Sequence, residues 1–134
     1  MSRTPPKVVA VLNTSDDTVE LLRVYLESEG YVVVSAHVSK LKRGELSIDK
    51  HIADHGPDAV VFDISPPYDS TWTFLEHLRA HPSMKQRPFV LTSTNVKRVH
   101  EVVASSADER LLEIIGKPYD LKEIVAAVKK AVGD

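Results

Sequence analysis

Five short apolar runs alternate with longer amphipathic stretches along the whole chain. A parallel sheet produces such an alternation, because a crossover must return the chain to the same edge before each new strand. The predicted strands cover residues 8–12, 31–36, 59–62, 89–92 and 111–115. The first of them, VVAVL, has no polar residue, which is typical of a strand covered on both faces. The pattern therefore predicts an α/β fold with a five-stranded parallel sheet between two layers of helices.

Four of the amphipathic stretches have a helical period. Apolar residues three and four apart predict helices over 17–29 and 71–81, and two more after Asn95 and Asp120, whose side chains suit N-caps. Gly30 is the expected stop of the first helix. The inward stripes are predicted to be Val19, Leu22 and Leu26; Phe74, Leu75 and Leu78; Val96, Val99, Val102 and Val103; and Leu121, Ile124, Val125 and Val128.

Two connections are less regular. The stretch 37–56 is predicted to hold a basic loop, SKLKRGEL, and then a helix over 49–55 that ends before Pro57. The basic loop is most simply a solvated connection, and a docking site for a partner is the alternative. The segment DISPPYDST is predicted to be a surface loop, because Pro66 and Pro67 lack the amide donor that a helix interior needs.

Length and composition exclude several classes of protein. The 134 residues suit a single domain, with residues 1–6 expected as a flexible tail and no output domain. A net charge of −2 without a basic stripe argues against direct nucleic-acid binding, and the absence of cysteine excludes disulfides and thiolate metal sites. The start, MSRTPPK, lacks the apolar stretch of a signal peptide, and no run approaches the ~20 apolar residues of a membrane span, so we expect a cytoplasmic protein without a membrane contact.

Polar side chains follow the predicted strands at the point where each strand ends. In open parallel sheets, ligands bind outside the carboxyl ends of the strands, so these residues are the candidate site. They are Asn13 and Thr14; Asp63; Thr92 and Ser93; and Gly116, Lys117 and Pro118. Together they offer one carboxylate, one ammonium group and several hydroxyls.

These strand ends read DISPP at Asp63, LTS at Thr92 and GKPYD at Lys117. In this combination the chain resembles a response-regulator receiver domain, the phosphoacceptor module of two-component signalling, over nearly its whole length. The resemblance implies a flavodoxin-like three-layer sandwich with strand order 2-1-3-4-5. It implies that Asp63 accepts a phosphoryl group, that Thr92 hydrogen-bonds this group and that Lys117 pairs with it. It also implies a cis bond before Pro118 and a Mg²⁺ site at Asp63 and the backbone carbonyl of Ser65.

The stretch NTSDD, residues 13–17, departs from the receiver pattern. Receivers place two adjacent carboxylates after the first strand to hold Mg²⁺, whereas Asn13 and Thr14 are neutral. Two unit charges ~4 Å apart interact by about 4 kcal/mol at an effective dielectric of ~20, and by twice that for a divalent ion, before desolvation. We therefore expect Mg²⁺ binding and phosphorylation to be weak or lost. Asp16 and Asp17 are interpreted as caps of a helix start, and a rearranged metal site that includes them is the alternative.

These observations predict a stand-alone receiver-like signalling module that acts through protein contacts and is not an enzyme. Its partner is expected to be a histidine kinase or a downstream signalling protein, and the chain itself a monomer or a weak homodimer. The alternative is a flavodoxin-like flavin or nucleotide carrier that binds phosphate with the loop 13–18. Two aspartates in this loop disfavour the carrier, because they repel a phosphate. Trp72 is expected in the partial core, where its fluorescence can report on the site.

Overall fold

The computed structural model describes residues 6–13, 15–45, 47, 50, 56–64, 66–82, 84, 87–103, 112–117 and 120–133. Its elements are β1 (Val8–Asn13), α1 (Asp16–Ser28), β2 (Val32–His37), α2 (Val38–Lys42), β3 (Ala59–Asp63), α3 (Tyr68–Arg79), β4 (Phe89–Ser93), α4 (Val96–Val103), β5 (Leu112–Gly116) and α5 (Leu121–Val132). The strands are parallel and their order is β2-β1-β3-β4-β5. The predicted fold class, strand order and strands are confirmed. Within the described ranges, no helix combines the length and apolar character of a membrane span.

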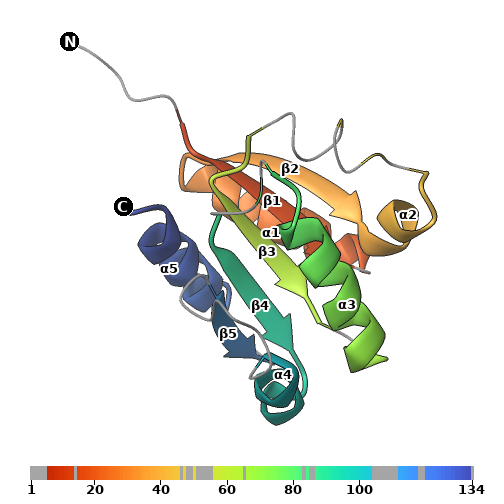
Figure 1. Ribbon diagram of the computed structural model, residues 1–134. Helices are drawn as coiled ribbons and strands as arrows, with labels where there is room; N and C mark the ends of the chain where they lie inside the picture. The colour runs from red at the N-terminus through yellow and green to blue at the C-terminus, as the bar shows by residue number, and fades with distance from the viewer. Residues whose placement is uncertain are drawn as a thin grey trace.

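Helices cover both faces of the sheet, with α3 in front of it and α1 behind it in Figure 1. Successive residues of a strand point to opposite faces, and the apolar side chains divide accordingly. Leu12 and Phe62 belong to the cluster that packs under α2, α3 and α4, whereas Val11 and Val61 belong to the cluster under α1 and α5. Burial on both faces explains why the central strands are almost continuous apolar runs.

The caps predicted at Asn95 and Asp120 and the helix stop predicted at Gly30 are confirmed. Asn95 Oδ1 accepts the backbone N–H of Arg98 at 3.0 Å. Asp120 opens α5 in a capping box with Glu123. Gly30 follows α1 with a φ of 94°, a conformation that glycine adopts without strain. The described side chains of the predicted inward stripes are buried or partly buried, and those of residues 102 and 103 lie outside the described part.

The basic stretch after β2 contains a short helix, α2, where a loop was predicted. Val38 and Leu41 are spaced for one helix face and are buried in the cluster under α3. His37 supports the start of α2, because its Nδ1 accepts the backbone N–H of Ser39 at 3.3 Å. The burial of two apolar side chains therefore decides the local conformation. The helix predicted over 49–55 lies outside the described residues.

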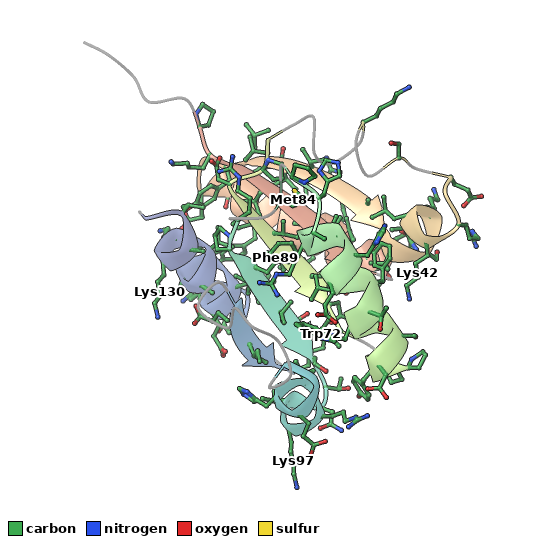
Figure 2. The ribbon with its side chains drawn as sticks, viewed as in Figure 1. Lys42, Trp72, Met84, Phe89, Lys97 and Lys130 are labelled. Carbon is green, nitrogen blue, oxygen red and sulfur yellow. The ribbon has the colours of Figure 1, made fainter. Side chains whose placement is uncertain are left out.

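The basic side chains of this stretch are exposed, as expected for a solvated face. Lys40 and Lys42 lie on α2, and Lys42 is labelled in Figure 2. The Nζ atom of Lys42 lies 5.8 Å from the ring centroid of Phe74 on α3. Arg43 pairs with Glu45 at 2.6 Å. Exposed ion pairs of this kind contribute little to stability. The alternative, a docking role for these cations, stays a hypothesis.

Helix α3 begins at Tyr68, three residues earlier than predicted. Pro67 is its N-cap, with a φ of −77°, and the peptide bond between Pro66 and Pro67 is cis. The first N–H groups of a helix have no partner within the helix, so a proline placed before the first turn removes no hydrogen bond. The prediction of a loop throughout DISPPYDST was wrong, because the prolines exclude a helix interior and not a helix that starts directly after them.

Gly116 at the end of β5 leaves space for the first residue of α4. A Cβ atom at this position would lie 2.8 Å from Cγ2 of Val96. We therefore expect Gly116→Ala to lower the free energy of unfolding by about 1.5 kcal/mol, the usual scale of overpacking. Urea denaturation of both variants checks this, and in a Val96→Ala background the loss should fall below about 0.5 kcal/mol. Equal losses in the two backgrounds would show that the contact with Val96 is not the cause.

Candidate functional site

The strand register brings the predicted site residues to one edge of the sheet. Asp63 pairs with Thr92 across β3 and β4, and Ser93 pairs with Gly116 across β4 and β5. The arrowheads of these three strands lie at the same edge in Figure 1. Lys117 follows β5 directly, and its backbone N–H donates to the carbonyl of Ser93 at 2.8 Å. Residues that are far apart in the sequence thus meet at the carboxyl ends of the strands, as predicted.

Asp63 is the buried centre of this group. Its Oδ1 accepts the hydroxyl of Thr92 at 2.7 Å and lies 2.6 Å from Nζ of Lys117. The side chain of Asp63 is 3% exposed and that of Lys117 is 28% exposed, so the lysine reaches from the solvent to a buried partner. The predicted grouping of the three side chains is present. Both contacts use Oδ1, so Oδ2 is the carboxylate oxygen of Asp63 that neither Thr92 nor Lys117 contacts.

Asn13 is buried at the end of β1. Its Oδ1 accepts the backbone N–H of Ser15 at 2.9 Å, a short turn that leads into α1. A side-chain amide has one oxygen and one NH₂ group. The oxygen keeps a second lone pair beside the hydrogen bond from Ser15, whereas the NH₂ group donates hydrogen bonds and cannot coordinate a cation, unlike the second oxygen of an aspartate. The neutral residue therefore removes an acceptor as well as a charge.

The described residues do not fit the Mg²⁺ site that the receiver resemblance implies. Mg²⁺ requires oxygen ligands in near-octahedral geometry, usually with carboxylates among them. Asp63 supplies a carboxylate whose Oδ1 is held by Lys117, and Asn13 supplies an engaged oxygen. No cluster of three His, Asp or Glu side chains that could hold a metal occurs among the described residues. Thr14, the backbone of Ser65 and the expected cis bond before Pro118 all lie outside the described part of the chain.

Ser15 caps α1, and this corrects the capping role predicted for Asp16 and Asp17. Ser15 has the extended backbone of an N-cap, and its Oγ accepts the backbone N–H of Thr18 at 3.3 Å. Asp16 and Asp17 occupy the first turn with exposed side chains. There they still stabilise the positive end of the helix dipole. The sequence does not distinguish Ser15 from the aspartates as the N-cap, because a hydroxyl and a carboxylate can both accept the free N–H groups at a helix start.

A charged cluster between α3 and α4 lies at the same edge of the sheet. Arg98 Nη2 donates to both carboxylate oxygens of Asp69 at 3.0 and 3.1 Å, and Nη1 donates to Glu101 at 3.1 Å. The hydrogen bond to Glu101 and the charge of Asp69 raise the pKa of the Arg98 guanidinium above its ordinary value. Sequence reasoning missed this cluster, because Asp69 and Arg98 are far apart in the chain and no local pattern pairs them.

Trp72 packs between α3 and the strands (Figure 2). It is buried in the same cluster as Phe62 and Ile64, the two neighbours of Asp63 in the sequence. Its predicted place in the core is confirmed. Because Trp72 shares this core cluster with the two sequence neighbours of Asp63, its fluorescence is expected to respond when the site changes.

The chain is similar in fold to several proteins of known structure. No protein-family model and no curated protein matches the sequence. Among solved structures, chemotaxis protein CheY4 of Vibrio cholerae matches with a TM-score of 0.71 at 14% identity, over 95% of this chain and 99% of that chain. A Chloroflexus aurantiacus protein described as a response regulator matches with a TM-score of 0.70 at 25% identity, over 97% and 100%. Response regulator TrrA of Thermotoga maritima, in complex with Mg²⁺ and BeF, matches with a TM-score of 0.65 at 23% identity, over 93% and 98%.

Proposed function

We propose that this protein, which has the fold of response-regulator receiver domains, is a signalling module of the two-component type whose phosphorylation is weak or lost. It acts through contacts with a histidine kinase or a downstream signalling protein. The observation that supports this proposal is the balance of charges at the carboxyl ends of the strands. One buried carboxylate, Asp63, is already paired with Lys117, and an amide, Asn13, stands where a second carboxylate would be needed.

The weak phosphorylation follows from electrostatics. A phosphoryl group brings further negative charge to Asp63, and its transfer depends mainly on positioning and on charge stabilisation. Lys117 offers one positive charge, which the carboxylate of Asp63 already neutralises. In the acyl phosphate an oxygen of Asp63 is bonded to phosphorus, so without a divalent cation the single ammonium group of Lys117 faces a phosphoryl charge of about −2. This site is therefore expected to hold an acyl phosphate poorly.

The flavin or nucleotide carrier is not favoured. The solved structures that share the fold at high coverage include response regulators. Asp16 and Asp17 are exposed in the first turn of α1, next to the place where a phosphate would bind, and they repel it. A colourless purified protein without flavin absorbance would agree with this conclusion.

A phosphorylation assay tests the proposal. The protein is incubated with millimolar Mg²⁺ and either a small phosphodonor or beryllofluoride, and intact mass and Trp72 fluorescence are followed. We expect no gain of a phosphoryl group and no fluorescence change at millimolar Mg²⁺ in the wild type. Asp63→Ala serves as the control, because it removes the acceptor atom.

One result would contradict the proposal. A phosphoryl adduct that forms on the wild type with Mg²⁺ and is abolished by Asp63→Ala would identify a competent site. If that adduct also required Asp16 or Asp17, the alternative of a rearranged metal site would be correct.

A further inference from the structure

Helices α1 and α5 lie side by side on one face of the sheet, with a groove between them. Leu22 and Leu26 of α1 and Ile124 and Val128 of α5 belong to the same core cluster on this face. The groove is an open pocket of about 330 Å³, at the small end of the range of roughly 300–1,000 Å³ that is usual for ligand pockets. Its lining residues are Tyr25, Glu29, Lys122, Val125, Ala126 and Lys129. The volume therefore suits a small molecule.

The middle of this α1–α5 groove is apolar. Val125 is buried, and Ala126, the next residue of α5, is exposed, so aliphatic surface is open to the solvent between the helices. Tyr25 of α1 is half-buried and supplies an aromatic side chain to the other wall. Leu21, one turn before Tyr25 on the same side of α1, is 56% exposed. A flat apolar group that covers these side chains would remove their surface from water.

Charged residues stand at the two ends of the apolar middle. On α5, Lys122 precedes Val125 by one turn and Lys129 follows it by one turn. Lys129 Nζ is paired with Glu29 Oε1 at 3.0 Å, so the charges at this end neutralise each other. Lys122 is exposed, and none of the residues that the structure describes forms an ion pair with it. The lining of the groove therefore keeps one uncompensated positive charge, in a chain whose net charge is −2.

We propose that the α1–α5 groove binds a small aromatic monoanion, an aryl carboxylate or sulfonate. Its acid group pairs with Lys122, and its rings cover Val125 and Ala126 beside Tyr25. Lys122 and Lys129 are about 10 Å apart along α5, at a rise of ~1.5 Å per residue, so a body of two aromatic rings fits between the charged ends. A second acid group would find Lys129 already engaged by Glu29. This inference goes beyond the proposed function, and it holds whether or not Asp63 accepts a phosphoryl group.

The apolar middle and the free ammonium group make different contributions to binding. Covering the apolar side chains supplies most of the affinity and does not depend on salt. The pair with Lys122 selects an acid over a neutral molecule, and salt weakens this pair because Lys122 is exposed. For a ligand of two or three rings in an open groove, we expect a dissociation constant on the order of 100 µM.

A titration of the whole chain with 8-anilinonaphthalene-1-sulfonate tests the site. This dye is an aromatic monoanion whose fluorescence reports contact with apolar surface. Lys122→Glu should raise its dissociation constant at least about tenfold, because repulsion replaces attraction at the acid group. Lys130→Glu is the matched control. It changes the net charge by the same amount on an exposed residue of α5 outside the groove lining, and it should raise the dissociation constant by less than about twofold.

Two further measurements test the apolar middle. Ala126→Gln places a longer side chain in the groove without a charge, and it should weaken dye binding at least about tenfold. In competition, 2-naphthoate should displace the dye from the wild type, whereas acetate at the same concentration should not, because it has the acid group without the rings.

Several results would overturn the proposal. They are equal effects of Lys122→Glu and Lys130→Glu, displacement by acetate as efficient as by 2-naphthoate, wild-type affinity in Ala126→Gln, and no saturable dye binding up to about 1 mM. A wild type that closes the groove by self-association would overturn it too. Ultracentrifugation would then show a mass above 14.9 kDa, and the dye would not bind.

Discussion

The double variant Asn13→Asp, Thr14→Asp is expected to bind Mg²⁺ about a hundredfold more tightly than the wild type. By the receiver pattern, each added carboxylate would interact with a divalent cation by several kcal/mol at an effective dielectric of ~20, and desolvation of the ion and repulsion between the acids offset part of this. A net gain of about 2.7 kcal/mol corresponds to a hundredfold.

The hydrogen bond of Asn13 explains why Asn13→Asp is expected to raise the affinity for Mg²⁺. In the wild type Oδ1 of Asn13 accepts the N–H of Ser15, and the remaining group is an NH₂ donor. An aspartate at this position can keep the same hydrogen bond with one oxygen and offer its second oxygen to the metal. The single variant Asn13→Asp is therefore expected to gain at least about tenfold in affinity without a change in the start of α1.

Isothermal titration calorimetry and the thermal midpoint measure the effect. At a Mg²⁺ concentration one hundred times the dissociation constant, binding adds about 2.7 kcal/mol to the free energy of unfolding. Without Mg²⁺ the double variant should be less stable than the wild type, because several carboxylates then repel one another. The matched control, Asp16→Asn with Asp17→Asn, should leave Mg²⁺ affinity unchanged. A large loss of affinity in that control would place the metal at the start of α1 and would contradict our interpretation.

Replacing Lys117 by methionine is expected to lower the free energy of unfolding by about 2 kcal/mol. The change leaves Asp63, whose side chain is 3% exposed, with an uncompensated charge and with the hydroxyl of Thr92 as its described partner. Breaking a fully buried ion pair costs about 3–5 kcal/mol, and the 28% exposure of the Lys117 side chain reduces that cost by solvent screening.

Removing the charge of Asp63 is expected to lower the free energy of unfolding less than removing that of Lys117. In Asp63→Asn the ammonium group of Lys117 can turn toward the solvent, so we expect a loss below about 1 kcal/mol. The double variant Asp63→Asn, Lys117→Met should recover most of the stability that Lys117→Met loses, because no buried charge remains. Urea denaturation of the three variants measures these differences. A Lys117→Met variant as stable as the wild type would show that the carboxylate is solvated or protonated in the absence of the lysine.

Much of the fold was predictable because the signals are local. Apolar runs identified all five strands, and Asn95 and Asp120 were correctly assigned as helix caps, since a cap needs one side chain within three residues of a free N–H. The errors also have local causes. The basic segment from residue 39 on is predicted as a loop because the five residues of α2 are too few for a clear period, and Tyr68 is predicted in a loop because the prolines before it mask a helix start.

The candidate site also has features that the sequence predicts and contacts that it does not. The sequence placed Asp63, Thr92 and Lys117 at strand ends, and the strand order, inferred from the receiver resemblance, brought them together as observed. Nothing in the sequence indicated that Arg98 binds Asp69, or that Glu29 of the α1 end pairs with Lys129 of α5. These contacts join residues that lie far apart in the chain, and they depend on how the helices pack on the sheet.

The sequence by itself therefore determined the α/β layers, the residues at the carboxyl edge and the missing acids after β1, because periodicity, capping and charge are properties of short segments. The tertiary structure alone decided that Asp63 is neutralised by Lys117 and that the oxygen of Asn13 is turned to Ser15. The physical reason is that a side chain chooses its partner by distance and burial in the folded chain. The amide of Asn13 has an acceptor oxygen and a donor NH₂ group, and only the folded backbone determines that the oxygen accepts the N–H of Ser15.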